Sequence, residues 1–278
     1  MKLANLDGRA ALVTPSGAID VATASAGCFG PSMRDVFDNW SAFADWGSTA
    51  HGGAVQPFDE SLLGSPVPEP RQVFAIGLNY SRHAAESGMT PPAIPATFTK
   101  FPASITGPFD AVSLPSAAVD WEVELVVVIG KQAVDVSEDD AWSYVAGLTV
   151  GQDLSERRVQ MAAGAQFSLG KSYTGFAPMG PWMVTLDEFD DPADLELGCS
   201  VNGTTMQQSR TSDLIFTVPQ LIAELSAVLP LLPGDIIFTG TPEGVGAARK
   251  PPVFLQPGDV LDSWIEGIGH IRNTMVTK

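Results

Sequence analysis

Apolar residues along this chain gather in short runs typical of β-strands, separated by turns rich in glycine and proline. After residue 70 such runs occupy six segments, 72–80, 120–130, 180–186, 195–203, 234–241 and 258–276. Apolar residues at helical spacing appear between them at 137–146, 155–163 and 218–229. Strands and helices do not alternate regularly and no repeat has a fixed period, which argues against a doubly wound sheet or a barrel of βα units. We therefore expect a β-rich α+β fold, a sandwich or roll with helices at its edge.

The first 70 residues show a different, mixed pattern. Residues 5–26 predict a hairpin around a Pro-Ser-Gly turn, and residues 32–48 have the spacing of one amphipathic helix. A connector at 63–71 follows, in which repeated prolines stop regular structure. We expect a small N-terminal α+β domain at residues 1–70 and a larger catalytic domain at residues 71–278.

The charge of the chain excludes several classes of partner. Its 32 acidic and 15 basic residues give a formal net charge of −17, which argues against binding to nucleic acid or to an anionic membrane surface. An anionic substrate must therefore be attracted by a local positive site. No apolar run approaches about 18 residues, and the N-terminus lacks the apolar stretch of a secretory signal. We expect a cytoplasmic protein with Cys28 and Cys199 as free thiols.

The segment 120–130 presents an electrostatic problem. Read as a strand, it places Glu122 and Glu124 on the same face, with Cα atoms roughly 6.6 Å apart. Two such charges repel by about 2.5 kcal/mol at an effective dielectric constant of about 20, before any cost of burial. Either the start of the strand is solvated and the glutamates meet surface lysines, or a buried cation lies between them.

A third carboxylate follows the next apolar strand. Asp153 comes two residues after the end of the run 146–151, at the start of a helical pattern. It is either the N-cap of that helix, with Glu156 as its capping-box partner, or a further ligand for a cation. Three carboxylates without a suitable histidine or cysteine form an oxygen-only site, which favours Mg²⁺, Mn²⁺ or Ca²⁺ over zinc.

The order and wording of these motifs resemble the fumarylacetoacetate hydrolase superfamily, in particular its small bacterial acylpyruvase-like and hydroxymuconate-isomerase-like members. The resemblance covers residues 72–278 and rests on six blocks, 77–88, 151–160, 169–182, 201–226, 233–246 and 258–273. Residues 1–70 resemble only the lead-in domain of the bacterial members. The resemblance implies a mixed β-sandwich roll and a metal triad of Glu122, Glu124 and Asp153 that holds Mg²⁺, with Mn²⁺ or Ca²⁺ as alternatives.

The resemblance also implies a catalytic pair on a mobile lid. His83 and Glu86 are spaced i, i+3 in "SRHAAESG", so on a short helix they share a face. Without the resemblance, such a pair is usually a surface contact. Within the family pattern, Glu86 orients His83, and His83 removes a proton from water.

Several cationic and polar residues complete the predicted site. On one helix Asp153, Arg157 and Gln160 would project from the same face. We expect Gln160 and Lys171 to stabilise an oxyanion, Arg157 and Lys100 to bind substrate, and Thr241, in a turn at 240–246, to donate its hydroxyl to a substrate carboxylate. The plainer alternatives are that Arg157 pairs with Asp153 or Glu156 and that Lys100 is solvated. The triad, a divalent ion and the three cationic side chains sum to +2, which suits a dianion.

These expectations lead to a metal-dependent hydrolase of aromatic compound catabolism that cleaves a C–C bond in a β-diketo acid. The substrate would be a small keto acid of the acylpyruvate or fumarylpyruvate type, and the reaction would pass through a metal-bound enolate. Decarboxylation of oxaloacetate or isomerisation of a hydroxymuconate-type acid are alternatives on the same site, and a protein without catalysis is a third. The resemblance implies a homodimer; the apolar segment 215–232 fits either an interface or an ordinary core helix.

Overall fold

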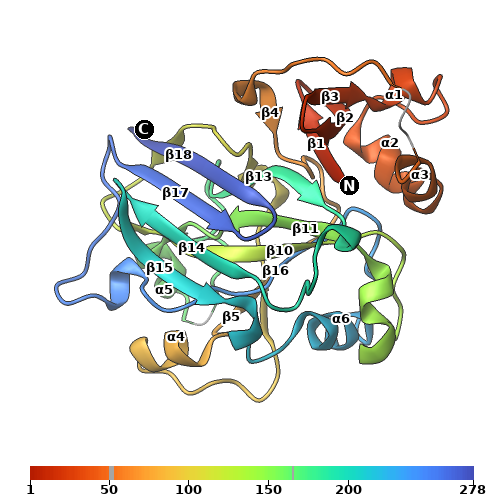
Figure 1. Ribbon diagram of the computed structural model, residues 1–278. Coiled ribbons are helices and arrows are strands. Elements are labelled where there is room, and N and C mark those ends of the chain that lie inside the picture. The colour runs from red at the N-terminus through yellow and green to blue at the C-terminus, as the bar shows by residue number, and fades with distance from the viewer. Residues whose placement is uncertain (50–52, 165) are drawn as a thin grey trace.

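The computed structural model describes residues 1–49, 53–164 and 166–278, and it is built around one large mixed sheet. Its strands follow the order β3-β2-β1-β13-β11-β10-β16-β5-β6, with β4 paired to β1 and β7 paired to β13 (Figure 1). Most neighbours are antiparallel, but β16 runs parallel to β5 and β13 parallel to β7. The strands of this sheet are β1 (Lys2–Leu6), β2 (Arg9–Thr14), β3 (Gly17–Asp20), β4 (Leu63–Gly64), β5 (Val73–Gly77), β6 (Ala96–Thr99), β7 (Ile105–Thr106), β10 (Val123–Ile129), β11 (Val145–Gln152), β13 (Ala177–Val184) and β16 (Ile236–Phe238).

A second, five-stranded sheet packs against the first. Its order is β15-β14-β17-β18-β8, and Figure 1 shows β14, β17 and β18 in front of β10, β11 and β13. One hydrophobic core contains Leu125 of β10 and Trp121, which precedes that strand, together with Ile271 and Met275 of β18, so it lies between the two sheets. The expected sandwich is confirmed. The strands are β8 (Val112–Leu114), β14 (Glu196–Val201), β15 (Thr204–Arg210), β17 (Val260–Ile265) and β18 (Gly269–Thr277), and a separate pair joins β9 (Val119–Asp120) to β12 (Ser155–Glu156).

Strand β10 is covered on both faces, as its apolar pattern predicts. Leu125 and Val127 belong to the core between the sheets, whereas Val126 and Val128 belong to a second core with Trp40 and Phe238. Every residue of the strand is buried. Its acidic end therefore cannot be an ordinary solvated strand start.

The N-terminal region extends the main sheet. The predicted hairpin is present as β2 and β3, and β1, which the sequence pattern did not indicate, pairs with both β2 and β13. The single helix expected at 32–48 is wrong: the chain forms α2 (Met33–Asp38) and α3 (Trp40–Gly47), because Asn39 leaves the helical conformation between them. Because the second core also contains residues of the main sheet, the division at residue 70 stays a prediction.

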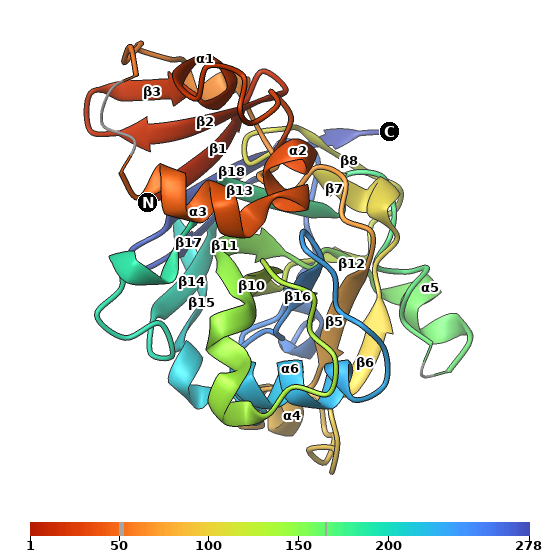
Figure 2. The same cartoon turned by 90° about the vertical axis from the view of Figure 1, so that its right-hand side faces the viewer.

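The remaining helices lie at the edges of the sheets. Figures 1 and 2 place the N-terminal strands and helices at one end of the molecule and α4 and α6 at the opposite end. These helices are α1 (Val21–Ala24), α4 (Ser81–Glu86), α5 (Arg157–Ala162) and α6 (Val218–Ser226), with 3-10 turns at Glu60–Leu62, Pro102–Ser104, Glu138–Tyr144, Leu186–Glu188, Thr211–Asp213 and Gly246–Ala248. Within the described ranges, none of the helices has the length and apolar character that crossing a membrane requires.

Two expectations about helices change in the structure. The segment 137–146 forms a 3-10 helix that ends at Tyr144, and its last two residues already belong to β11. The apolar residues of α6, including Leu221 and Ile222, are buried in the core between the sheets. The core-helix explanation therefore accounts for them, and the oligomeric state stays a prediction.

Candidate active site

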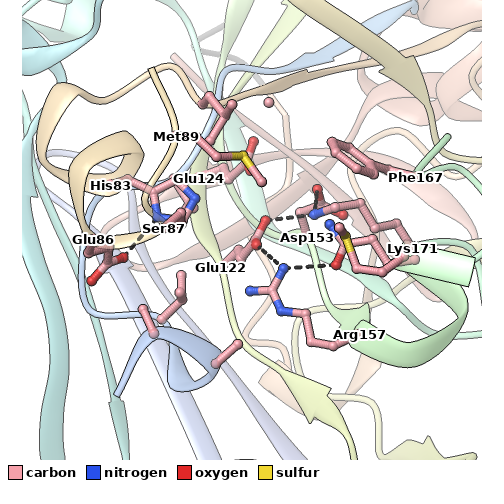
Figure 3. A pocket seen from close by; sticks show the side chains of 18 of the residues that line it. His83, Glu86, Ser87, Met89, Glu122, Glu124, Asp153, Arg157, Phe167 and Lys171 are labelled. Carbon is pink, nitrogen blue, oxygen red and sulfur yellow. Dashed lines mark hydrogen bonds and ion pairs between the residues drawn. The ribbon is translucent and has the colours of Figure 1, made fainter. Parts of the chain in front are cut away.

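The predicted site residues meet around one cavity of about 540 Å³, a size ordinary for small-molecule sites. The cavity opens between α4, the acidic end of β10, and α5 (Figure 3). Nine of the ten residues predicted for the site line it: His83, Glu86, Glu122, Glu124, Asp153, Arg157, Gln160, Lys171 and Thr241.

The three carboxylates of the predicted triad come together. Glu122, Glu124 and Asp153 are buried, and each offers one oxygen within 4.8 Å of the others. The pairing of β10 with β11 produces this arrangement, since Glu124 lies opposite Gly151 and the Asp153 N–H donates to the Glu122 carbonyl oxygen at 2.9 Å. Two adjacent antiparallel strands thus carry carboxylates separated by some thirty residues to one point.

Asp153 is not a helix N-cap. Helix α5 begins at Arg157, and its cap is Glu156, whose carboxylate accepts the Val159 N–H at 2.6 Å. Asp153 lies before β12 and faces lysines instead: Lys100 Nζ and Lys171 Nζ each lie 2.6 Å from one of its oxygens. The N-cap alternative is therefore wrong.

Electrostatic compensation is uneven across the triad. Glu122 pairs with Lys171 at 2.6 Å and with Arg157 at 2.7 Å. Burial alone would raise the pKa of Glu122, but these two cations outweigh it and lower that pKa. Glu124 has no Lys or Arg partner among the described residues, and it accepts only the Gly240 N–H, at 2.7 Å. Burial, followed by the charges of Asp153 and Glu122, raises the pKa of Glu124 well above its ordinary value.

The triad fits a hard divalent cation. All its donors are carboxylate oxygens, which Mg²⁺ and Mn²⁺ accept readily. A buried carboxylate without a cationic partner is costly, and a metal shared with Asp153 and Glu122 would remove the cost at Glu124. The observation that carries this assignment is the unpaired state of Glu124 within the described part of the chain.

The predicted histidine–glutamate pair is formed on α4. His83 Nδ1 lies 2.8 Å from Glu86 Oε1, and the carboxylate of Glu86 also accepts the Gly244 N–H at 2.9 Å. With its proton on Nδ1, the ring would have Nε2 as a proton acceptor. Figure 3 shows His83 between Glu86 and the triad. Whether α4 moves as a lid stays a prediction.

Lys100 occupies a different place from the one expected. It is fully buried, and it is the one predicted site residue that is not among the cavity-lining residues. Its ammonium donates to Asp153 and to the carbonyl oxygen of Lys171. The solvated alternative is wrong, and direct contact with substrate is not available to a side chain held behind Asp153.

Two predicted donors already use their hydrogens within the protein. The three N–H groups of Lys171 meet Glu122, Asp153 and Ser155, the last at 2.9 Å. The hydroxyl of Thr241 donates to the Val123 carbonyl oxygen at 2.9 Å, because a carbonyl can only accept. Thr241 therefore cannot donate to a substrate carboxylate while this bond is in place.

Asp120 is a site residue that the sequence reasoning missed. Arg157 binds it through Nε at 2.8 Å and Nη2 at 2.6 Å, rather than binding Asp153 or Glu156 as the plainer alternative expects. The N–H groups of Gly246 and Ala247 also donate to Asp120. Its position two residues before Glu122 in the same extended segment was the available signal. Counting Asp120 lowers the expected charge of the site by one, from +2 to +1.

Gln160 remains a donor facing the cavity. Its Oε1 accepts from Arg157 Nη1 at 2.9 Å, while its amide N–H groups have no hydrogen-bond partner among the described residues. Arg157 and Gln160 project from α5, but Asp153 precedes this helix, so the prediction that one helix carries all three residues is wrong. The three side chains nevertheless line the same cavity.

The fold and the buried acidic triad are those expected of the fumarylacetoacetate hydrolase family, and the comparison with known families agrees. The family model "Fumarylacetoacetate (FAA) hydrolase C-terminal" matches residues 72–276, so the chain belongs to this family.

Three relatives indicate the range of chemistry. Oxaloacetate tautomerase Fahd2a, mitochondrial, from Rattus norvegicus is 47% identical over 214 residues, 76% of this chain and 68% of the relative. A Mycobacterium smegmatis protein whose crystal structure was described under the name HpcE is 54% identical with a TM-score of 0.96, covering 100% of this chain and 99% of its own. Maleylpyruvate hydrolase from Sphingobium sp. SYK-6, in complex with manganese(II) and pyruvate, is 31% identical with a TM-score of 0.81 over 100% and 99% of the two chains.

Proposed function

We propose that this protein is a divalent-metal-dependent hydrolase that cleaves a C–C bond in β-diketo acids of the acylpyruvate or fumarylpyruvate type. The observation that carries the proposal is the position of the His83–Glu86 pair on the same cavity as the acidic triad. The pair supplies a base for water, and the triad supplies a cation site for a chelating keto acid. The manganese and pyruvate in the Sphingobium relative support this combination.

Glu122, Glu124 and Asp153 would hold Mg²⁺, with Mn²⁺ as the second choice. When bound, the ion would polarise the keto oxygens of the substrate and stabilise negative charge on the pyruvate part as the C–C bond breaks. Arg157, fixed by Asp120, keeps Glu122 in position.

The protein's own residues account for the proton movements. His83 Nε2 takes a proton from water as the water oxygen attacks the acyl carbonyl, and Glu86 stabilises the resulting imidazolium. Gln160 donates an N–H to the oxyanion, because Lys171 has no free hydrogen. When the C–C bond breaks, its electron pair stays with the methylene carbon of the pyruvate part, and His83 returns its proton there. The products are a carboxylic acid and pyruvate.

Tautomerisation of oxaloacetate is the second candidate, favoured by the name of the rat relative. His83 would then move a proton between the substrate's methylene carbon and its enol oxygen, without water. Decarboxylation of oxaloacetate and isomerisation of a hydroxymuconate-type acid need the same cation site. The first ligands of the metal do not distinguish these reactions.

A side-by-side product assay separates the candidates. The purified protein with Mg²⁺ or Mn²⁺ receives fumarylpyruvate, acetylpyruvate or oxaloacetate, and released pyruvate, CO₂ and the ultraviolet absorbance of the enol are followed. We expect pyruvate and one equivalent of acid from an acylpyruvate. Rapid enol–keto exchange of oxaloacetate with no acid from either acylpyruvate would overturn the hydrolase in favour of the tautomerase, and CO₂ release would favour the decarboxylase.

A homodimer belongs to the same proposal and rests on the family resemblance, whereas a cytoplasmic location stays an expectation from the sequence pattern. Sedimentation equilibrium tests the first: a mass of one chain, 29.2 kDa, at micromolar concentration would contradict it.

A further inference from the structure

Besides Arg157 and Lys171, the cavity is lined by an arginine that takes no part in the mechanism above. Arg249 follows the 3-10 helix Gly246–Ala248 and belongs to the lining of the same cavity as the triad. Its Nη2 donates to the carbonyl oxygens of Met206 at 3.0 Å and Gly244 at 3.3 Å. The guanidinium carbon lies 5.8 Å from the centre of the Trp121 ring. These contacts hold the guanidinium in one orientation.

The charge of Arg249 is not compensated within the described part of the chain. No carboxylate there lies within ion-pair distance of it, whereas Arg157 and Lys171 are each bound to two carboxylates of the site. Its Nε is buried and has no hydrogen-bond acceptor among the residues that the structure describes. In a protein with twice as many acidic as basic residues, an unpaired arginine with a buried unpaired N–H is unusual. That N–H is out of reach of the cavity as well as of solvent. Nη1, by contrast, is accessible and makes no hydrogen bond within the described residues, so an anion in the cavity would find its donors there.

The cavity also offers apolar surface to a substrate. The lining includes Met89, Phe98, Met161, Phe167 and Val245, which suit the carbon chain of an acyl group. Lys250, beside Arg249, adds a second, exposed positive charge to the lining. A substrate whose keto acid end meets the triad could therefore place a second anionic group at Arg249.

We propose that Arg249 binds the distal carboxylate of the substrate and makes the site selective for keto diacids over keto monoacids of the same length. The proposal rests on the proposed function for its place in the reaction. An arginine held through Nη2 suits a carboxylate, because the N–H groups of Nη1 remain for the anion and the two backbone contacts fix their direction.

The test compares two substrates that differ only at the far end. In fumarylpyruvate the acyl group ends in a carboxylate, and in crotonylpyruvate a methyl group replaces it. We expect Arg249→Gln to lower kcat/KM for fumarylpyruvate about 10- to 100-fold, the range for losing a hydrogen-bonded charge pair, mostly through KM. The value for crotonylpyruvate stays within about twofold. Equal losses on both substrates, or no loss on either, would overturn the proposal.

Two further variants separate binding from folding. Arg82→Gln is the matched control, since Arg82 is a nearby exposed arginine that pairs with Glu243 outside the cavity; it leaves both substrates unchanged. Arg249→Lys keeps the charge but loses the planar fork, so we expect partial loss on fumarylpyruvate alone. If Arg249→Gln does not fold, this lysine variant decides: unchanged selectivity would contradict the proposal.

A binding measurement keeps this inference independent of the proposed reaction. Calorimetry in the presence of Mn²⁺ compares 2-oxoadipate with 2-oxohexanoate, two six-carbon keto acids of which only the first has a distal carboxylate. We expect the wild type to bind 2-oxoadipate more tightly and Arg249→Gln to remove the difference. Should the wild type cleave neither acylpyruvate, the proposed function fails while this result still decides the role of Arg249. Equal affinity of the wild type for both acids would overturn the inference.

Discussion

Glu124 stands apart from the other two carboxylates of the triad because no lysine or arginine among the described residues contacts it. Glu122 and Asp153 each face cationic side chains, whereas Glu124 faces only the Gly240 N–H. Holding a buried charge in this way costs free energy in the absence of a metal. The charge of Glu124 is therefore expected to favour metal binding and to lower the stability of the metal-free protein.

Glu124→Gln tests this opposition. Glutamine keeps an oxygen to accept the Gly240 N–H but removes the charge, so without metal the free energy of unfolding should rise by about 1–2 kcal/mol. With Mn²⁺ the wild type gains stability by mass action and the variant does not. Urea unfolding with and without Mn²⁺ measures both effects. Glu60→Gln, at an exposed position, is the control. If Mn²⁺ raised the free energy of unfolding equally in Glu124→Gln and Glu60→Gln, the triad would not be the metal site.

The His83–Glu86 pair yields a graded prediction for activity. His83→Asn removes the base and should lower kcat about 10²- to 10⁴-fold, whereas Glu86→Gln keeps a partner for the ring but loses the charge and should cost about 10- to 100-fold. Mn²⁺ affinity by calorimetry should stay unchanged in both, since neither residue is a ligand. A loss of metal binding in either variant would place the pair in the metal site instead.

At the scale of elements, one segment organises the site. Backbone N–H groups from the stretch 240–247 bind Glu124, Glu86 and Asp120, and thereby connect β10, α4 and β9. The sequence predicted a turn at 240–246. Its N–H groups position Glu124 and Glu86 at the cavity and Asp120 behind Arg157. Backbone donors place carboxylates without adding charge to the site.

Gly244→Ala should disturb this positioning. Gly244 has a φ of 102°, and an added Cβ would collide with the carbonyl oxygen of Met206, so the segment must move and release Glu86. We expect kcat to fall at least about tenfold and stability to fall by about 1–3 kcal/mol. Gly203→Ala is the control, because its φ of 78° carries the same type of strain with no atom near the added Cβ. Gly203→Ala should lose stability without losing activity. Equal kcat values for Gly244→Ala and Gly203→Ala would contradict the prediction.

The junction of β3 and α1 gives a prediction for pH. Arg9 and the hydrogen bonds from Thr23 lower the pKa of Asp20 below its ordinary value. A lowered carboxyl pKa adds stability above the unfolded pKa, about 4, and this stability is lost as pH falls through the folded pKa. Asp20→Asn keeps the cap on α1 but not the charge, so its thermal midpoint should fall by about 1–3 °C at pH 7 and by less at pH 3. Asp45→Asn, exposed, is the control, and equal shifts at both pH values would count against the prediction.

At the scale of the whole molecule, the N-terminal region and the main sheet share one core. Strand β1 pairs with β13, and Trp40 belongs to the same cluster as Val126 and Val128 of β10. The face of β10 opposite the second sheet is therefore covered by residues that precede the family match. The predicted boundary at residue 70 marks a change in the sequence pattern, but the hydrophobic core contains side chains from both sides of it.

Removal of residues 1–70 tests how far the larger part folds alone. The truncated chain would expose Val126, Val128 and the free edge of β13, so we expect no cooperative unfolding transition and a strong tendency to aggregate. Co-expression of residues 1–70 as a separate chain should restore a folded complex. Circular dichroism and urea unfolding measure both, and a cooperative transition of residues 71–278 alone would support two independent domains.

The sequence by itself determined the elements and chemical groups that local pattern controls. The alternation in 120–130 indicated a buried strand with two carboxylates on one face, and the i, i+3 spacing placed His83 beside Glu86. Pairing between distant segments was decided only by the tertiary structure. Asp120 as the partner of Arg157, the burial of Lys100 behind Asp153, the carbonyl that occupies the Thr241 hydroxyl, and the unpaired Arg249 all depend on contacts across many residues. Periodicity fixes which face of a strand or helix a side chain occupies, but its partner depends on which elements pack against that face.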